Sequence, residues 1–344
     1  MKKKPSPLKI IGIVLLCLVV LVLIAAVAGY IYLNSLLDMM DREEIVGDDS
    51  LSEEEVYEEE PTYDVPDSEE EIEDAWQDYE DVQDTEVLDK QNIENILLIG
   101  SDRLTKNQNG RADSMMILSI NHDTGHIHLV SLMRAMYVNI HRKSGETWGM
   151  LNASYSWGGT ALLIDTIERN FRVEIHHYVV VDFDSFENAI DLLGGVEVTL
   201  TRAEASYMSE CIREEFYPGK QILNGQQARF YCQIRKIDSD FKRTSRQRTV
   251  ILSLINKFSK SDVSQLTNLA KQLLPTVKTD LTNADVLRLL MEAPRLLKDP
   301  PQQRMLPIEN ENGSYTGMIY VNGREMYKVD FETNIKALHE LLES

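Results

Sequence analysis

One short basic segment, RKIDSDFKRTSRQR from Arg235 to Arg248, carries most of the chemistry visible in the sequence. It gathers six lysine and arginine residues in a 344-residue chain whose formal net charge is −21. If its second half is helical, Arg243, Arg246 and Gln247 lie three and four residues apart and share one face. Guanidinium groups bind phosphate oxygens in pairs and stay charged at any working pH. The segment therefore predicts a phosphate-binding surface.

Composition leaves a second interpretation of this segment open. Its arginines could instead lie on a solvated helix surface and pair with Asp238 and Asp240 in the same stretch. Exposed pairs of this kind contribute little and need no ligand. The segments that precede it must decide between the two interpretations.

Three charged residues stand where predicted strands begin or end. The apolar run Asn95–Gly100 is a predicted buried strand that opens into a loop containing Asp102. Two further strands flank the hairpin sequence Asp123-Thr124-Gly125. They span residues 114–121 and 126–133. Because hairpin strands are antiparallel, Asp113 before the first strand and Arg134 after the second fall at the same end of the sheet.

Helix-like and strand-like segments alternate farther along the chain. The predicted order is helix, strand, helix and strand, over residues 152–171, 177–183, 185–195 and 196–200. A second hairpin is expected at Asn322-Gly323, followed by a last helix from Phe331 to Leu342. This alternation predicts an α/β fold, a layered α/β/α sandwich around a mixed β-sheet, preceded by one N-terminal transmembrane helix.

The apolar run from Ile10 to Leu33 contains no charged residue and is long enough to cross a bilayer. Lysines precede it and acidic residues follow, so the positive-inside rule places residues 1–9 in the cytoplasm and the rest outside. A cleaved signal peptide ending near Ala28 is the alternative, but the run continues past that point. We expect a single-pass anchor over residues 10–33 in the cell membrane.

The stretch from Glu43 to Glu86 contains 22 acidic residues and no lysine or arginine. Such a segment has few apolar groups to bury and repels itself, so residues 34–90 are predicted to form a disordered extracytoplasmic stalk. Cation capture and docking of a basic partner are the alternatives. The folded domain would then be residues 91–344, with a core over 92–260 and C-terminal helices and a hairpin over 261–344.

The three cysteines do not form a recognisable framework. Cys17 lies in the predicted anchor, and a disulfide between Cys211 and Cys232 is conceivable outside the membrane. The sequence has no CxxC or HExxH pattern, which makes a zinc or thiol enzyme a poor interpretation. Without its acidic stretch the chain is close to neutral and lies outside the cytoplasm, so no nucleic-acid partner is expected.

Several ordered segments together resemble the LytR-CpsA-Psr family of cell-envelope phosphotransferases, over about residues 92–260. The anchor precedes them. They are NILLIGSDR, GRADSMMILSI, SLMRAMYV, MLNASYSWGG, LNGQQA and RKIDSDFKRTSRQR.

This resemblance implies an enzyme that moves a glycopolymer, teichoic-acid-like or capsular, from a polyprenyl pyrophosphate carrier to peptidoglycan through a phosphodiester. Asp102 and Asp113 match the family's metal-binding carboxylates, for Mg²⁺ or alternatively Mn²⁺. The implied catalytic residues are Asp102, Arg111, Arg134, Arg235 and Arg243. The implied substrate-binding residues are Arg111, Arg134, Arg235, Arg243, Arg246 and Gln247.

Two departures from the family pattern bear on catalysis. Arg134 is followed by Ala135 where the family has an aspartate, and Gln233 stands where it has a further arginine. A non-catalytic protein that binds or senses the polyprenyl pyrophosphate glycan is therefore the alternative. The sequence does not identify the glycopolymer, the acceptor sugar or the oligomeric state.

Overall fold

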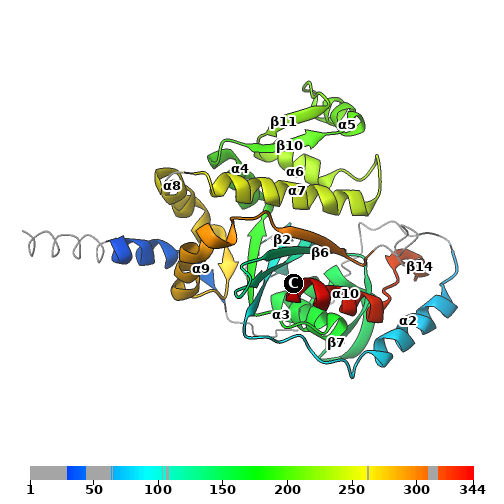
Figure 1. The fold of residues 1–344 in the computed structure, drawn as a ribbon. Helices are drawn as coiled ribbons and strands as arrows, with labels where there is room; N and C mark the ends of the chain where they lie inside the picture. The colour runs from blue at the N-terminus through cyan, green and yellow to red at the C-terminus, as the bar shows by residue number, and fades with distance from the viewer. Residues whose placement is uncertain are drawn as a thin grey trace, which may run out of the picture.

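The fold is built around a seven-stranded mixed sheet with strand order β1-β12-β9-β2-β5-β6-β13 (Figure 1). The computed structural model describes residues 29–43, 63, 65–102, 104–105, 108–261, 263–308 and 317–344. The strands of this sheet are β1 Asp41–Arg42, β2 Ile93–Ser101, β5 Ala112–Asn121, β6 Ile127–Leu132, β9 His177–Asp182, β12 Lys278–Thr279 and β13 Gln302–Leu306. The predicted mixed α/β fold is confirmed.

Helices lie on both sides of this sheet (Figure 1). On one face lie α3 (Leu151–Phe171) and α10 (Phe331–Glu343). Over the other lie α4 (Phe183–Leu192), α6 (Gly225–Gln233), α7 (Asp240–Phe258) and α8 (Val263–Leu273), which leads into the short helix η1 (Leu274–Thr276). The predicted strand and helix order agrees with these elements, and α7 joins residues 240–248 of the basic segment and the apolar residues after them into one helix.

The two faces of β2 are used differently. Successive side chains of a strand point to opposite faces. The side chains of Leu97 and Ile99 are buried in the main core. Leu98 and Gly100 line a cavity beneath the helices on the other face, and Ile99 also contributes to this lining. One face of the sheet is therefore packed, and part of the other is left open.

Smaller hairpins surround the main sheet. β10 (Val196–Leu200) and β11 (Gly219–Leu223) pack with α5 (Arg202–Ile212) and α6 around a second core. The remaining pairs are β3 (Leu104–Thr105) with β4 (Gln108–Asn109), β7 (Tyr137–Arg142) with β8 (Gly145–Met150), and β14 (Met318–Val321) with β15 (Arg324–Tyr327). The predicted hairpin at Asn322-Gly323 is the turn between β14 and β15.

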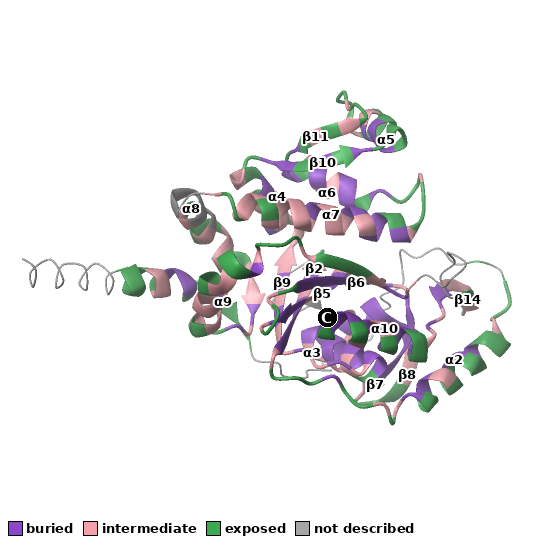
Figure 2. Cartoon of the chain, viewed as in Figure 1, coloured by how far each residue is buried: buried purple, intermediate pink, exposed green. Residues whose placement is uncertain are grey.

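The predicted disordered stalk is wrong for its last part. Helix α2 (Glu69–Asp81) buries Ile72, Ala75 and Tyr79, three and four residues apart, although its other positions are mostly acidic and exposed (Figure 2). The Tyr79 ring lies edge-on to Trp148 at 5.4 Å between centroids. The acidic composition gave no sign of these three apolar positions, which form one face of the helix and are sufficient to pack it on the domain.

The first part of the predicted stalk is also folded. Residues 29–37 are helical, Leu36, Leu37 and Met40 are buried, and β1 adds a parallel edge strand beside β12. Of the predicted anchor, residues 10–28 lie outside the described part of the chain. Within the described ranges, no helix combines the length and the apolar character that a membrane span requires.

We expect Tyr79→Ala to lower the free energy of unfolding by about 3 kcal/mol, because it removes a buried ring from the aromatic cluster. Glu73→Ala, at an exposed position of the same helix, is the matched control and should change stability by less than about 0.5 kcal/mol. Urea unfolding followed by tryptophan fluorescence measures both. Equal stabilities of the two variants would mean that α2 is not part of the cooperative fold.

Candidate functional site

A cavity of about 470 Å³ lies between the sheet and the helices above it. Helix α7 forms one wall with Arg243, Gln247, Ile251 and Leu254, which follow one another at intervals of four, four and three residues. This spacing places them along one face of the helix. The lining thus changes along α7 from cationic and polar to apolar. A cavity graded in this way fits an elongated amphiphile with an anionic end.

The cationic end is organised by the carboxylate of Asp240, the first residue of α7. It accepts a hydrogen bond from Arg243 at 2.9 Å. The Nε atoms of Arg134 and Arg235 lie 3.9 and 3.7 Å from its oxygens. Arg134 comes from the end of β6 and the other two from the basic segment, and all three line the cavity. Asp240 therefore offsets the mutual repulsion of three guanidinium groups.

Asp113 lies at the same end of the cavity. Its carboxylate is 3.6 Å from Nη1 of Arg134, and its backbone oxygen accepts a hydrogen bond from Gln247 at 3.3 Å. Burial raises the pKa of Asp113, and the nearby arginines oppose this shift. Burial lowers the pKa of Arg243 to about 10, with repulsion from Arg134 as a further cause. Arg243 stays cationic at neutral pH, ready to receive an anion.

Asp102 and Arg111 bind each other beside this end. Strands β2 and β5 are antiparallel and pair Ser101 with Ala112. Asp102, which follows Ser101, therefore lies next to Arg111, which precedes Ala112. The Asp102 carboxylate accepts from the backbone N–H of Arg111 at 2.7 Å and from its Nε at 3.2 Å. Arg111 lines the cavity. The sequence prediction that Asp102, Asp113 and Arg134 lie at one end of the sheet agrees with this arrangement.

The carboxylates of Asp102 and Asp113 suit a hard divalent cation. Each is partly exposed, with 28% and 24% of its side chain accessible. Their mutual repulsion contributes to the raised pKa of Asp113. Mg²⁺ takes oxygen ligands, and two carboxylates completed by phosphate oxygens and water are a typical set. The donor set therefore fits Mg²⁺ in the presence of an anionic ligand.

The other end of the cavity is apolar. Leu98 from β2 and Val179 from β9 form its floor, while Leu273 of α8 and Val277 form its far wall. Val277 directly precedes β12, the strand on which β1 pairs. The apolar end therefore lies near the point where the N-terminal segment joins the sheet.

Arg246 does not reach the cavity, and here the prediction that it binds substrate is corrected. Its Nε donates to Glu204 of α5 at 2.6 Å, its Nη1 donates to the carbonyl of Ile234 at 2.9 Å, and its Nη2 pairs with Asp238. The side chain is buried in these contacts. Of the two interpretations of the basic segment, anion binding suits Arg243 and Gln247, and internal pairing describes Arg246.

Two residues of the site escaped the sequence analysis. Asp240 was considered only as a surface partner, although a carboxylate three residues before Arg243 can reach it. Arg229 of α6 lines the cavity, donates to Glu187 at 2.9 Å and lies over the Phe183 ring. Its position in α6, outside the basic segment, gave no signal.

The residues that depart from the expected pattern have different surroundings. Gln233 ends α6 and lines the cavity, so an arginine there would add charge at this wall. Ala135 packs against the main core and supplies no carboxylate beside Arg134. Cys211 and Cys232 are both free thiols, and burial raises the pKa of Cys232 to about 12. The conceivable disulfide is not formed.

Comparison with known proteins gives one family match. The model of the LytR_cpsA_psr family matches residues 62–342. The teichoic acid transferase TagU of Bacillus subtilis is 34% identical over 198 residues, which are 57% of this chain and 62% of TagU. The chain thus spans less than two thirds of that relative's length.

Two solved structures have a similar fold. The crystal structure of Bacillus subtilis TagV matches with a TM-score of 0.59 and 24% identity, over 74% of this chain and 97% of TagV. A structure of TagT, also a Bacillus subtilis protein, contains bound octaprenyl pyrophosphate lipid. It matches with a TM-score of 0.55 and 19% identity, over 76% of this chain and 94% of TagT.

We expect Asp240→Asn to lower the free energy of unfolding by about 3 kcal/mol, because three guanidinium groups lose their shared counter-charge. Inorganic pyrophosphate should restore part of this loss, since it supplies negative charge to the same groups. Thermal unfolding with and without pyrophosphate measures both effects.

Asp165→Asn is the control for Asp240→Asn. It breaks the exposed pair between Asp165 and Arg169 and should cost less than about 1 kcal/mol, with no response to pyrophosphate. If both variants respond to pyrophosphate equally, Asp240 does not organise an anion site.

Proposed function

The chain belongs to the LytR_cpsA_psr family, and from this premise we propose that it transfers a glycopolymer from a polyprenyl pyrophosphate carrier to peptidoglycan through a phosphodiester. The observation that carries the proposal is the graded cavity, with three arginines at one end and apolar side chains at the other. Polyprenyl pyrophosphate has the same division between an anionic end and an apolar tail. The name of TagU, a teichoic acid–peptidoglycan transferase, supports the same activity class.

In this proposal the pyrophosphate lies among Arg134, Arg235 and Arg243. Arg243 Nε has no hydrogen-bond partner among the described residues, and the group is buried. An unsatisfied buried donor of this kind is costly, and a phosphate oxygen would satisfy it. The prenyl tail would extend along Ile251 and Leu254 to the apolar end.

The reaction would join a sugar hydroxyl of peptidoglycan to the phosphorus that bears the glycan. The new bond is P–O, the bond that breaks leads to the bridging oxygen, polyprenyl phosphate leaves, and the hydroxyl proton passes to solvent or a base. Arg134, Arg235 and Arg243 would stabilise the negative charge that develops on the leaving phosphate. Fixing both phosphates in one orientation lowers the barrier further, with little covalent work by the protein.

Asp102 and Asp113 are the residues proposed to hold Mg²⁺, or Mn²⁺ in its place. A bound divalent cation would neutralise phosphate charge at the mouth of the cavity. Arg111 holds Asp102 in place through its backbone N–H and side chain. Asp102 would thereby be positioned before any ligand arrives.

A second function, binding without turnover, is favoured by one observation. Gln233 supplies no charge to the cavity wall where the family pattern has an arginine, and Ala135 supplies no carboxylate beside Arg134. Charge stabilisation at the transition state would be weaker, while the apolar contacts that retain the lipid would persist. This alternative is a non-catalytic regulator that holds the polyprenyl pyrophosphate glycan.

The proposed location follows from the proposed substrate. Polyprenyl-linked glycans reside in the membrane, and peptidoglycan lies outside it. An uncleaved anchor over residues 10–33, with the cytoplasm at its N-terminal end, would place the cavity on the correct side. A reporter fused after Ser344 should then be active only outside the cytoplasm.

We expect Arg235→Ala to lower both lipid retention and glycan transfer, the latter by about tenfold or more, which corresponds to about 1.4 kcal/mol at the transition state. Arg235 is half exposed, so the fold should survive the change. The assay supplies a labelled polyprenyl pyrophosphate glycan, a peptidoglycan oligomer and Mg²⁺. Arg304→Ala, at an exposed position on β13 outside the cavity, is the control for lost charge.

The same assay separates the two functions. Turnover by the unaltered chain rejects the non-catalytic alternative. Retention of lipid without turnover, across several glycans, rejects the transferase. In that case Ala135→Asp combined with Gln233→Arg is expected to recover transfer, since the pair restores one carboxylate and one guanidinium.

A further inference from the structure

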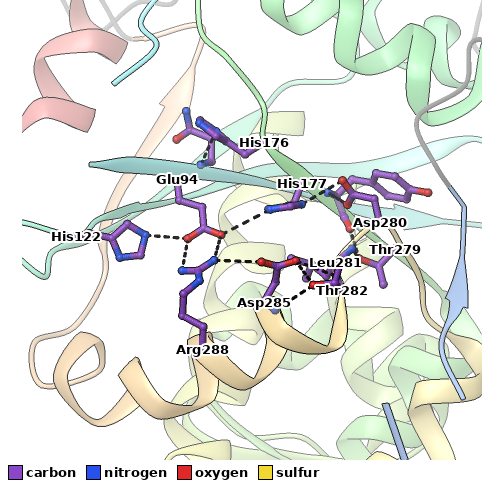
Figure 3. Close-up of polar contacts among 12 residues, drawn as sticks. Glu94, His122, His176, His177, Thr279, Asp280, Leu281, Thr282, Asp285 and Arg288 are labelled. Atoms are coloured by element: carbon purple, nitrogen blue, oxygen red, sulfur yellow. Dashed lines mark hydrogen bonds and ion pairs between the residues drawn. The ribbon is translucent and has the colours of Figure 1, made fainter. Parts of the chain in front are cut away.

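Helix α9 (Asn283–Leu296) directs the side chain of Arg288 toward Glu94 of the sheet, with Asp285 beside it (Figure 3). Arg288 donates two hydrogen bonds, at 2.8 and 2.7 Å, to the carboxylate of Glu94 on β2. Glu94 is 7% exposed. The contact is a bidentate ion pair between a buried carboxylate and a partly exposed guanidinium, and it fixes the rotation of α9 about its own axis.

Further polar contacts hold the same side of α9 inward. His122 contacts Glu94 at 2.8 Å through Nε2 and Glu292 of α9 at 3.0 Å through Nδ1. Asp285, one turn before Arg288, caps the start of α9 through Thr282 and lies 3.8 Å from Arg288. Positions 285, 288 and 292 are three and four residues apart, so one helix face carries these charges.

The outer side of α9 is apolar. Met291 is 77% exposed and Leu290 is 40% exposed, and Ala284 and Pro294 are also exposed. A helix on the surface of a water-soluble domain normally has the opposite arrangement. The inner face of α9 also carries apolar side chains, Leu289 and Leu296, which pack on the sheet. The additional apolar side chains on the outer face indicate that this face contacts something less polar than water.

The N-terminal segment indicates what the outer face of α9 contacts. The helix over residues 29–37 reaches the domain next to α9 by its C-terminal end, where Asp38 accepts a hydrogen bond from Asn283 at 2.6 Å (Figure 1). Tyr30 and Ile31 are 61% and 62% exposed. They belong to the 24-residue apolar run from Ile10 to Leu33. The apolar side chains of α9 are thus next to a helix that leads into a sequence suited to a bilayer.

Cationic side chains accompany this apolar surface. Arg295 and Lys298 are exposed at the end of α9. Lys271 of α8 lies over the ring of Tyr32 at 5.7 Å. Tyrosine beside apolar residues, with lysine and arginine at the edge, is the composition found where helices meet lipid headgroups.

We propose that the outer face of α9, formed by Ala284, Leu290, Met291 and Pro294, rests in the interfacial layer of the bilayer beside the N-terminal helix. The inference rests on the membrane location in the proposed function and deepens it. Leu98 and Val179, which form the apolar floor of the cavity, also pack in the cluster that holds Leu289 and Leu296 of α9. A membrane-resting α9 therefore brings the apolar end of the cavity close to the lipid tails. A prenyl chain could then enter with little exposure to water.

The test uses the full chain in vesicles of phosphatidylcholine and phosphatidylglycerol. Met291→Trp adds an indole to α9, and Ile222→Trp adds one at a 68% exposed position on β11, far from α9 (Figure 1). Replacing part of the lipid by its dibrominated form should quench the added fluorescence at position 291 several-fold more than at position 222. Wild-type fluorescence gives the background of the native tryptophans.

Equal quenching at the two positions overturns the proposal. Cross-linking of Met291→Cys between copies in the same vesicles, without extra quenching, would overturn it in favour of a self-association surface. Transfer by the wild type is measured separately. An active chain without quenching at position 291 rejects only the membrane surface, and quenching in an inactive chain rejects only the transferase.

Discussion

The carboxylate of Asp240 lies among three guanidinium groups, and the site depends on this one arrangement. Arg134 follows β6, whereas Arg235 and Arg243 belong to the basic segment between α6 and the first turn of α7, so two distant parts of the chain must converge. Cations brought together in a buried place repel one another unless an anion is present. Asp240 supplies that anion in the free protein, and a pyrophosphate would strengthen the same neutralisation. The site is in this sense preassembled for its ligand.

The cavity has a second requirement, which is an incompletely packed sheet face. Residues of β2 alternate between the main core and the cavity, and α3 and α10 fill only the core side. On the other side, α7 lies over the sheet but leaves a volume of about 470 Å³. An empty apolar volume of this kind costs stability, because its lining lacks contacts. An apolar ligand would regain those contacts, so the same feature that weakens the free protein would favour binding.

Much of the fold could be predicted from local patterns. The strands around Asp123-Thr124-Gly125 and the ends that carry Asp113 and Arg134 followed from alternation and turn chemistry. The pairing of Arg246 with Asp238 was one of the two interpretations of the basic segment. Its pairing with Glu204 could not be predicted, because Glu204 is 42 residues away and only the fold brings α5 beside α7. Helix α2 was missed because its acidic composition outweighed three apolar positions. Contacts between residues far apart in the sequence, and helices with only a few apolar positions, cannot be predicted from composition.

The central claim is that one cavity binds an anionic head and an apolar tail together. Calorimetry on the full chain can compare a short polyprenyl pyrophosphate with the matching prenyl alcohol and with inorganic pyrophosphate. The account predicts that the complete lipid binds at least about tenfold more tightly than either part, since each half contributes more than about 1.4 kcal/mol. An alcohol or a free pyrophosphate that binds as tightly as the whole lipid would contradict it.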